Sequence, residues 1–119
     1  MRVLIVDDNV EFLATARLLL EHEGMVVVDI ATTGAEALHR AEEHGPDVIL
    51  VDVELGEESG FDVVKQLANV PVLSSSMVLV SAHEREDLLE LLDTSPAIGF
   101  LAKSELNAQR IIELVHASS

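Results

Sequence analysis

The chain has 119 residues, and its 22 acidic against 7 basic side chains give a formal net charge of −15. It has no cysteine, which excludes disulfide frameworks, thiolate metal sites and thiol catalysis. Its apolar runs are shorter than the ~18 residues of a membrane span, and the scarcity of basic and aromatic residues argues against direct DNA or RNA contact. We therefore expect one cytoplasmic domain that contacts neither membrane nor nucleic acid.

The first predicted elements are a strand and a helix. Residues 2–6 are apolar apart from Arg2, which favours a buried strand. Asp8 or Asn9 is placed to cap the helix that follows, and Gly24 to end it. The stripe expected along this helix is Phe12, Leu13, Ala16, Leu19, Leu20 and Glu23.

A second strand is expected at residues 25–30, which are short and rich in β-branched side chains. Thr33 with Glu36 three residues later is a capping box that begins a helix, and Gly45-Pro46 ends it. The inner face predicted for this helix carries Ala35, Leu38 and Ala41.

The clearest strand is Val48-Ile49-Leu50-Val51-Asp52, where four apolar residues run directly into a carboxylate. Such a run is typical of a central strand covered on both faces. A loop with two glycines and three glutamates is expected at residues 53–60, and Ser59 is placed to cap a third helix. The inward residues predicted for that helix are Phe61, Val64, Leu67 and Ala68.

Two segments compete for the fourth strand. Residues 77–80 are preferred over residues 70–73 because their apolar run ends in a small polar residue, Ser81. Ser81 and Glu84 form a second capping box, so we expect a fourth helix over residues 84–93.

The last elements are a fifth strand at residues 97–101, with Lys103 at its end, and a helix capped by Ser104. The buried stripe predicted for this helix is Ala108, Ile111, Ile112 and Val115. Five strands alternating with five helices predict an α/β fold with a parallel sheet and helices on both faces.

Parallel strands would bring polar side chains to one edge of the sheet, where ligands bind in such folds. The residues that follow four of the strands are Asp7, Asp8, Asp52, Ser81 and Lys103. Three clustered carboxylates repel one another unless a cation is present, and a hard ion such as Mg²⁺ suits oxygen ligands. One carboxylate could then act as a nucleophile toward a phosphoryl group, with the lysine and the hydroxyl beside it.

Each of these residues also has a simpler interpretation. Asp8 and Ser81 could be ordinary helix caps, and Lys103 a solvated surface lysine. Asp52 is harder to explain away, because a carboxylate behind a doubly covered strand meets a desolvation cost that a neutral residue avoids.

The order and spacing of these motifs resemble the receiver domain of two-component response regulators along essentially the whole chain. The matching segments are residues 4–9, residues 51–56 with Gly60, residues 80–82 and residues 99–103. The resemblance implies a flavodoxin-like (βα)5 doubly wound parallel sheet of strand order 2-1-3-4-5. It also implies that residues 1–119 form a single receiver domain.

By this resemblance, a sensor histidine kinase phosphorylates Asp52 in a phosphorelay. Mg²⁺ would be held by Asp7, Asp8, Asp52 and the backbone carbonyl of Glu54. A receiver of this kind is a phosphoprotein with self-phosphorylation and self-dephosphorylation chemistry, and not a true enzyme.

The resemblance also implies a switch at three further residues. Ser81 would be the hydroxyl that moves toward the phosphoryl group, Lys103 its ionic partner, and Phe100 the aromatic residue whose rotamer follows. The surface around the fourth helix, fifth strand and fifth helix would then read out phosphorylation.

The sequence departs from the family pattern at three positions. Ser104 replaces the usual Pro after Lys103, so the common cis bond there would cost about 2.5–4 kcal/mol here. Gly56 replaces another usual Pro, which is expected to free the loop after Asp52. Glu54 lies close enough in sequence to Asp52 to alter phosphate lifetime.

Two other functions compete with this interpretation. One is a pseudo-receiver that binds proteins without being phosphorylated, although the retained acid cluster argues against it. The other is a Mg²⁺-dependent phosphatase with an aspartate nucleophile, which usually needs Asp-x-Asp after the first strand, whereas Asp7 and Asp8 are adjacent. The receiver is either free-standing or part of a longer transcription regulator, and a homodimer through its charged last helices is an alternative to plain solvation.

Overall fold

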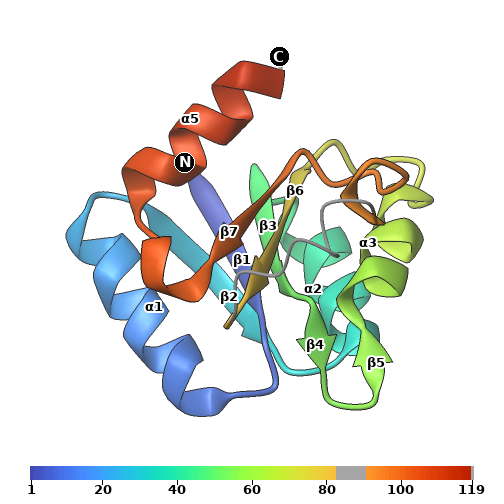
Figure 1. The fold of residues 1–119 in the computed structure, drawn as a ribbon, viewed down its shortest axis with the longest axis horizontal. Helices are drawn as coiled ribbons and strands as arrows, with labels where there is room; N and C mark the ends of the chain where they lie inside the picture. Colours follow the sequence, from blue (N-terminus) through green and yellow to red (C-terminus); the bar gives the residue numbers. More distant parts are fainter. Residues whose placement is uncertain (83–90, 119) are drawn as a thin grey trace.

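The computed structural model describes residues 1–82 and 91–118, which contain a five-stranded parallel sheet (Figure 1). Its strands lie in the order β2-β1-β3-β6-β7. Because β4 and β5 form a separate hairpin, β6 and β7 are the fourth and fifth strands of this sheet. The predicted strand order 2-1-3-4-5 is therefore confirmed. The strands are β1 (Arg2–Val6), β2 (Val26–Ala31), β3 (Val48–Asp52), β6 (Ser76–Ser81) and β7 (Gly99–Ala102).

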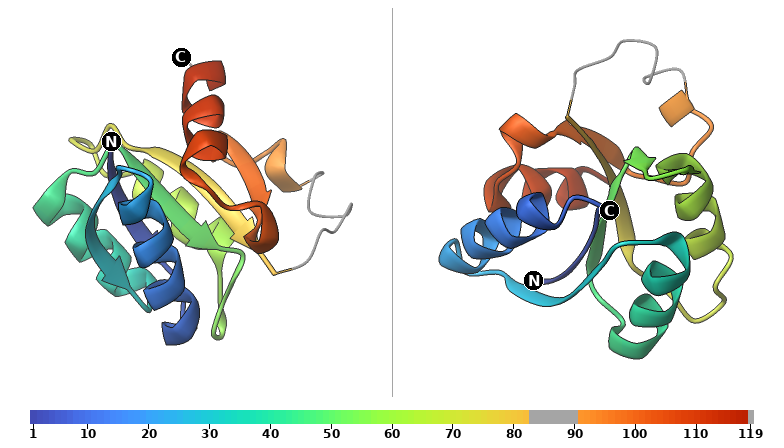
Figure 2. Two further views of the ribbon diagram at one scale, coloured as in Figure 1. Left: turned by 90° about the vertical axis from the view of Figure 1, so that its left-hand side faces the viewer. Right: turned by 90° about the horizontal axis from the view of Figure 1, so that it is seen from below.

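Helices cover both faces of this sheet. Figure 2 shows α1 and α5 on one side and α2 and α3 on the other. None of the described helices is long and apolar enough to span a bilayer. The predicted fourth helix, including its Ser81–Glu84 capping box, falls largely on residues 83–90, outside the described residues. The bounds are α1 (Val10–His22), α2 (Gly34–His44), α3 (Gly60–Ala68) and α5 (Ala108–Ser118).

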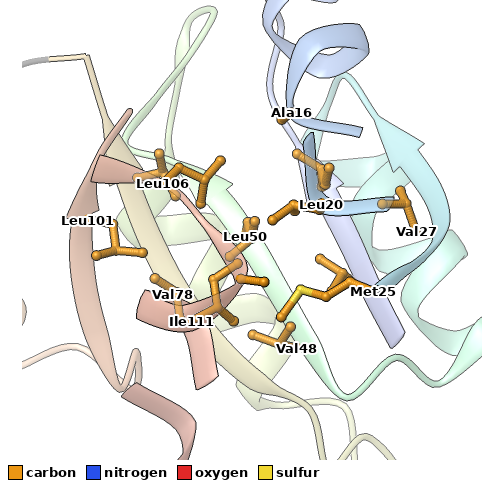
Figure 3. Packing of buried hydrophobic residues seen from close by; sticks show 14 of the residues in the cluster. Ala16, Leu20, Met25, Val27, Val48, Leu50, Val78, Leu101, Leu106 and Ile111 are labelled. Atoms are coloured by element: carbon orange, nitrogen blue, oxygen red, sulfur yellow. The ribbon is translucent and has the colours of Figure 1, made fainter. Parts of the chain in front are cut away.

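Strand alternation divides the core into two layers. In β1, Val3 and Ile5 face the α1 and α5 side, whereas Leu4 and Val6 face α2 and α3. β3 alternates in the same way and is buried along its whole length. Figure 3 shows the layer beneath α1 and α5, where Leu20, Leu50 and Ile111 meet. The central strands are therefore held by apolar contacts on both sides, which fixes the position of the acids at their ends.

The sequence predicted which helices pack inward, but not always the rotation of each helix about its axis. One residue in each described helix was wrongly placed: Leu19, Ala35, Ala68 and Ile112 are all exposed. In α2 and α3, Ala37 and Val63 are buried instead. Each residue turns a helix by ~100°, so neighbouring positions cannot be separated reliably where several are apolar. Glu23 has a structural role, because its side chain accepts a hydrogen bond of 2.8 Å from the Ala108 N–H at the start of α5.

Helix caps agree with the sequence at Thr33 and Ser59 but not at the last helix. Residues 103–105 form a short 3₁₀ helix, η1 (Lys103–Glu105), and α5 begins only after it. Asn107, rather than Ser104, caps α5 by accepting a 2.8 Å hydrogen bond from the Arg110 N–H. The prediction at Ser104 was wrong because the chain makes an extra turn before the helix begins.

The segment after Asp52 forms a hairpin instead of the predicted loop. β4 (Glu54–Leu55) pairs antiparallel with β5 (Glu58–Ser59) across a two-residue turn, at the lower edge of the sheet in Figure 1. Gly56, at the first turn position, has φ of +62°, which proline cannot adopt. The glycine therefore permits an ordered turn between two paired strands. The expectation that Gly56 frees the loop after Asp52 was wrong.

Gly60 lies where the hairpin meets α3 and packs against the backbone of Asp52. A Cβ atom at this position would meet the Asp52 carbonyl oxygen at 2.1 Å. The Gly60 N–H donates a 2.8 Å hydrogen bond to the Val53 carbonyl. Only glycine allows this approach, so Gly60 helps to fix the backbone of the residue that ends β3.

We expect Gly60→Ala to lower the free energy of unfolding by about 3 kcal/mol or more, because the backbone at Asp52 must move. Gly45→Ala is the matched control, since Gly45 has a positive φ of 53° but open space around its Cβ position. That substitution should cost only about 1 kcal/mol through backbone strain. Equal losses of stability in urea titrations of the two variants would contradict the steric explanation.

Candidate functional site

Three aspartates meet at the carboxyl edge of β1 and β3. Asp7 and Asp8 directly follow β1, and Asp52 is the last residue of β3. One carboxylate oxygen from each lies within 4.8 Å of the others. Asp7 and Asp52 are only 1% and 7% exposed, whereas Asp8 is exposed. The clustering expected from the sequence is thus present, at the ends of two largely buried strands.

Lys103 reaches this cluster from the end of β7. Its Nζ lies 2.7 Å from Asp7 Oδ2 and 3.3 Å from Asp52 Oδ2. The lysine side chain is only 17% exposed, and its Nζ also lies 4.3 Å from the centroid of the Phe12 ring. The alternative of a solvated surface lysine is therefore wrong.

Asn9 organises the segment that contains Asp7 and Asp8. Its N–H donates to Asp7 Oδ1 at 2.9 Å, and its own side chain accepts hydrogen bonds from the Glu11 and Phe12 N–H groups. Asn9 is thus the cap of α1. The interpretation of Asp8 as a helix cap is wrong, and its carboxylate is left at the mouth of the site.

Burial raises the pKa of Asp52 to about 6. The Glu54 N–H, which donates to Asp52 Oδ1 at 3.1 Å, opposes this increase, and so does Lys103. Repulsion from Asp7 adds to it. Lys103 and the Glu54 N–H therefore offset only part of the cost of a negative charge on Asp52, and a further cation would offset more of it.

The pKa of Lys103 shifts upward for a related reason. Burial alone would lower the pKa, but the contacts with Asp7 and Asp52 outweigh it and raise the pKa above its usual value. The lysine is therefore an ammonium ion at neutral pH, and it supplies one positive charge to three carboxylates.

The other residues predicted for the site lie around this cluster. Ser81 ends β6, is 6% exposed and is in register with Ala102, next to Lys103. Phe100 lies in β7, is partly buried and packs against the α2 and α3 side of the core. Glu54 is exposed in β4. The Lys103–Ser104 peptide bond is trans, as the replacement of proline favours.

Glu58 is a contributor that the sequence did not reveal. Its carboxylate accepts a 2.9 Å hydrogen bond from the Gly34 N–H at the first turn of α2, 24 residues away. A Cβ atom at residue 34 would lie 2.4 Å from Glu58 Oε2, so a larger residue there would displace the Glu58 carboxylate. Glu58 thereby ties the hairpin carrying Glu54 to α2. No local pattern could have predicted a contact between two elements so far apart in the chain.

The arrangement has the donor set for a hard divalent cation. Three carboxylates converge, two of them buried, and a single ammonium offsets part of their charge. Carboxylate oxygens are the ligands that Mg²⁺ and Ca²⁺ prefer, with water completing the shell. The same geometry leaves Asp52 beside Lys103, where a transferred phosphoryl group could be paired.

Comparisons with known proteins agree with this geometry. The family model "Response regulator receiver domain" matches residues 3–116. A putative transcriptional regulator of Pseudomonas aeruginosa is 32% identical over 104 residues, which are 87% of this chain and 50% of that protein. The chemotaxis protein CheY of Bacillus subtilis is 26% identical over 97% of this chain and 94% of its own length.

Solved structures resemble the chain as well. The receiver domain of the putative response regulator NarL from Mycobacterium tuberculosis has a TM-score of 0.80 at 30% identity, covering 98% of this chain and 91% of that one. This chain spans about half the length of the first curated relatives that it matches. Those relatives are named as transcriptional regulators.

Replacing Asp52 by Asn should stabilise the metal-free protein at neutral pH. Because the folded-state pKa of Asp52 is about 6, above its unfolded value, the wild type loses stability as the pH rises from about 4 to about 6. Asp52→Asn does not titrate there, so we expect it to be more stable by about 1–2 kcal/mol at pH 8 and nearly equal at pH 4. Urea unfolding in EDTA measures the difference, and a constant offset across this range would contradict the assignment.

Glu58→Ala should loosen the hairpin. We expect a loss of about 1 kcal/mol, with faster hydrogen exchange at the Gly34 and Glu54 amides, because a charged acceptor at a helix N-terminus is removed. Glu57→Ala removes the same charge from the exposed turn and should change stability by less than about 0.5 kcal/mol. Similar exchange rates in the two variants would show that Glu58 does not anchor the hairpin.

Proposed function

The chain belongs to the response regulator receiver domain family, and we propose that it is a phosphoaccepting switch in a two-component phosphorelay. In this proposal, residues 1–119 act as one receiver domain and Asp52 accepts a phosphoryl group from a sensor histidine kinase in the cytoplasm. The observation that carries the proposal is the buried Asp52 carboxylate, 3.3 Å from the Lys103 ammonium, at the end of the central strand.

Mg²⁺ is the cofactor in this proposal. Asp7, Asp8 and Asp52 would hold it together with the backbone carbonyl of Glu54, and the convergence of the three carboxylates within 4.8 Å supports the assignment. When bound, the ion supplies charge neutralisation for the carboxylates and for the oxygens of the transferring phosphoryl group.

The chemistry of this chain is a transfer to Asp52. A carboxylate oxygen of Asp52 bonds to phosphorus while the bond from phosphorus to the kinase histidine nitrogen breaks, and the ring, which carries a proton on its other nitrogen, leaves as neutral imidazole. Lys103 pairs with a phosphoryl oxygen, since it already lies beside Asp52, and the Ser81 hydroxyl donates to another. Water later cleaves the acyl phosphate and restores the Asp52 carboxylate, so in this proposal the domain is a phosphoacceptor that resets itself rather than an enzyme for an external substrate.

The output is a shift between two conformations. Ser81 moves toward the phosphoryl group, Phe100 changes rotamer, and the surface around residues 84–93, β7 and α5 changes its partners. Control of transcription through an output domain fits relatives that are twice as long, and a second copy of this chain is an additional candidate partner. Glu54, two residues beyond Asp52, is expected to change the lifetime of the phosphoryl group.

Intact-mass spectrometry tests the proposal. After incubation with Mg²⁺ and acetyl phosphate, we expect one adduct of about 80 Da on the wild type. Asp52→Ala and a sample with EDTA should gain none. Mg²⁺ binding without an adduct would favour the pseudo-receiver, and continuous release of phosphate from a phosphate monoester, a substrate other than the phosphodonor, would favour a phosphatase.

A further inference from the structure

The Phe12 ring makes an unusual contact at the site. The Lys103 Nζ lies 4.3 Å from the ring centroid, while the same atom contacts Asp7 and Asp52. The sequence predicted Phe12 only as part of the apolar stripe of α1, and its ring does pack against the core beneath α1. Its contact with the ammonium is a separate property.

The chain fixes the ring and Asp7 through one short segment. Asn9 donates its N–H to Asp7 Oδ1 and accepts the Phe12 N–H in its side chain, at 2.9 and 3.1 Å. Phe12 therefore lies in the capped first turn of α1, at a set position relative to the carboxylate that holds Lys103. Lys103 arrives from β7, at the other end of the sequence.

A ring and a carboxylate hold an ammonium ion differently. Another carboxylate would neutralise the lysine, whereas the face of an aromatic ring attracts the cation through its quadrupole and leaves the net charge unchanged. The contact is strongest where water is excluded, and Lys103 is 17% exposed. The ring contact therefore takes nothing from the charge that Lys103 can offer to an incoming phosphoryl group.

We propose that Phe12 is a positioning residue that holds the Lys103 ammonium beside Asp52 through a cation–π contact. This inference rests on the proposed function, because the positioned lysine serves the phosphoryl group on Asp52. Without the ring, only the ion pairs with Asp7 and Asp52 hold the ammonium. It can then turn more often toward the exposed Asp8 or toward water, and a smaller fraction of the molecules has it in place for transfer.

Stepwise fluorination of the Phe12 ring separates this role from packing. Site-specific incorporation of mono-, di- and trifluorophenylalanine keeps the shape of the ring while weakening its attraction for cations. We expect the initial rate of self-phosphorylation by acetyl phosphate, at saturating Mg²⁺, to fall with each fluorine, reaching about 3- to 10-fold for the trifluoro variant. The control places the same fluorinated phenylalanines at Phe61, which is buried on the α2 and α3 side. These variants should phosphorylate within about 2-fold of the wild-type rate. A rate that is insensitive to fluorination at Phe12 would overturn the proposal.

Proton NMR of the unphosphorylated protein provides a second readout. The Lys103 ε-methylene protons should be shifted upfield by the ring current and lose this shift in Phe12→Leu. Absence of the shift in the wild type would overturn the contact itself. If the wild type gains no phosphoryl group while the shift is present, the proposed function fails and the positioning role fails with it. If phosphorylation proceeds but ignores fluorination, only the role of Phe12 fails.

Discussion

One ammonium shared between two buried carboxylates is the interaction on which the site depends. Asp7 and Asp52 lie at the ends of strands that are covered on both faces, so each carboxylate is removed from water. Lys103 recovers part of that desolvation cost, but it offers one charge to a cluster of three acids. The cluster is thus built with a deficit of positive charge, which destabilises the empty site and favours a cation. The apolar layers on both sides of β1 and β3 stabilise the fold enough to hold this arrangement.

The hairpin after Asp52 contacts this residue through backbone groups, whereas Lys103 contacts it through a side chain. The backbone of Gly60 packs against the Asp52 carbonyl, and Gly56 has the positive φ that the turn requires. The Glu54 N–H is thereby directed at Asp52 Oδ1. Proline could not take this place, because its ring does not allow the φ of +62° that Gly56 has in the turn. The glycine here is compatible with order because the hairpin is paired and Glu58 ties it to α2.

The sequence was sufficient for the sheet and for the acid cluster, because both follow from local patterns. Uninterrupted apolar runs identify central strands, and the residue after each run must lie at the same edge of a parallel sheet. It was insufficient where neighbouring residues compete for the same role. Asn9 rather than Asp8 caps α1, and Ala37 rather than Ala35 is buried in α2. Contacts such as those of Phe12 with Lys103 and of Glu58 with Gly34 join distant segments, so only the folded chain defines them.

The proposed switch has a short physical route from the site to the surface. Ser81 is in register with Ala102, the residue before Lys103, and Phe100 lies two residues earlier on the same strand. If Ser81 moves toward a phosphoryl group on Asp52, it displaces the end of β6 against β7, where Ala102 is buried and has little room to adjust independently. Phe100 is partly buried at the margin of the core, so a change of its rotamer would expose less apolar surface than the same change at a fully buried residue. Coupling through a packed strand pair therefore requires only a small displacement at the site. Under that proposal, a displacement of β7 would reach both Lys103, through its ion pairs, and Phe100, through its packing.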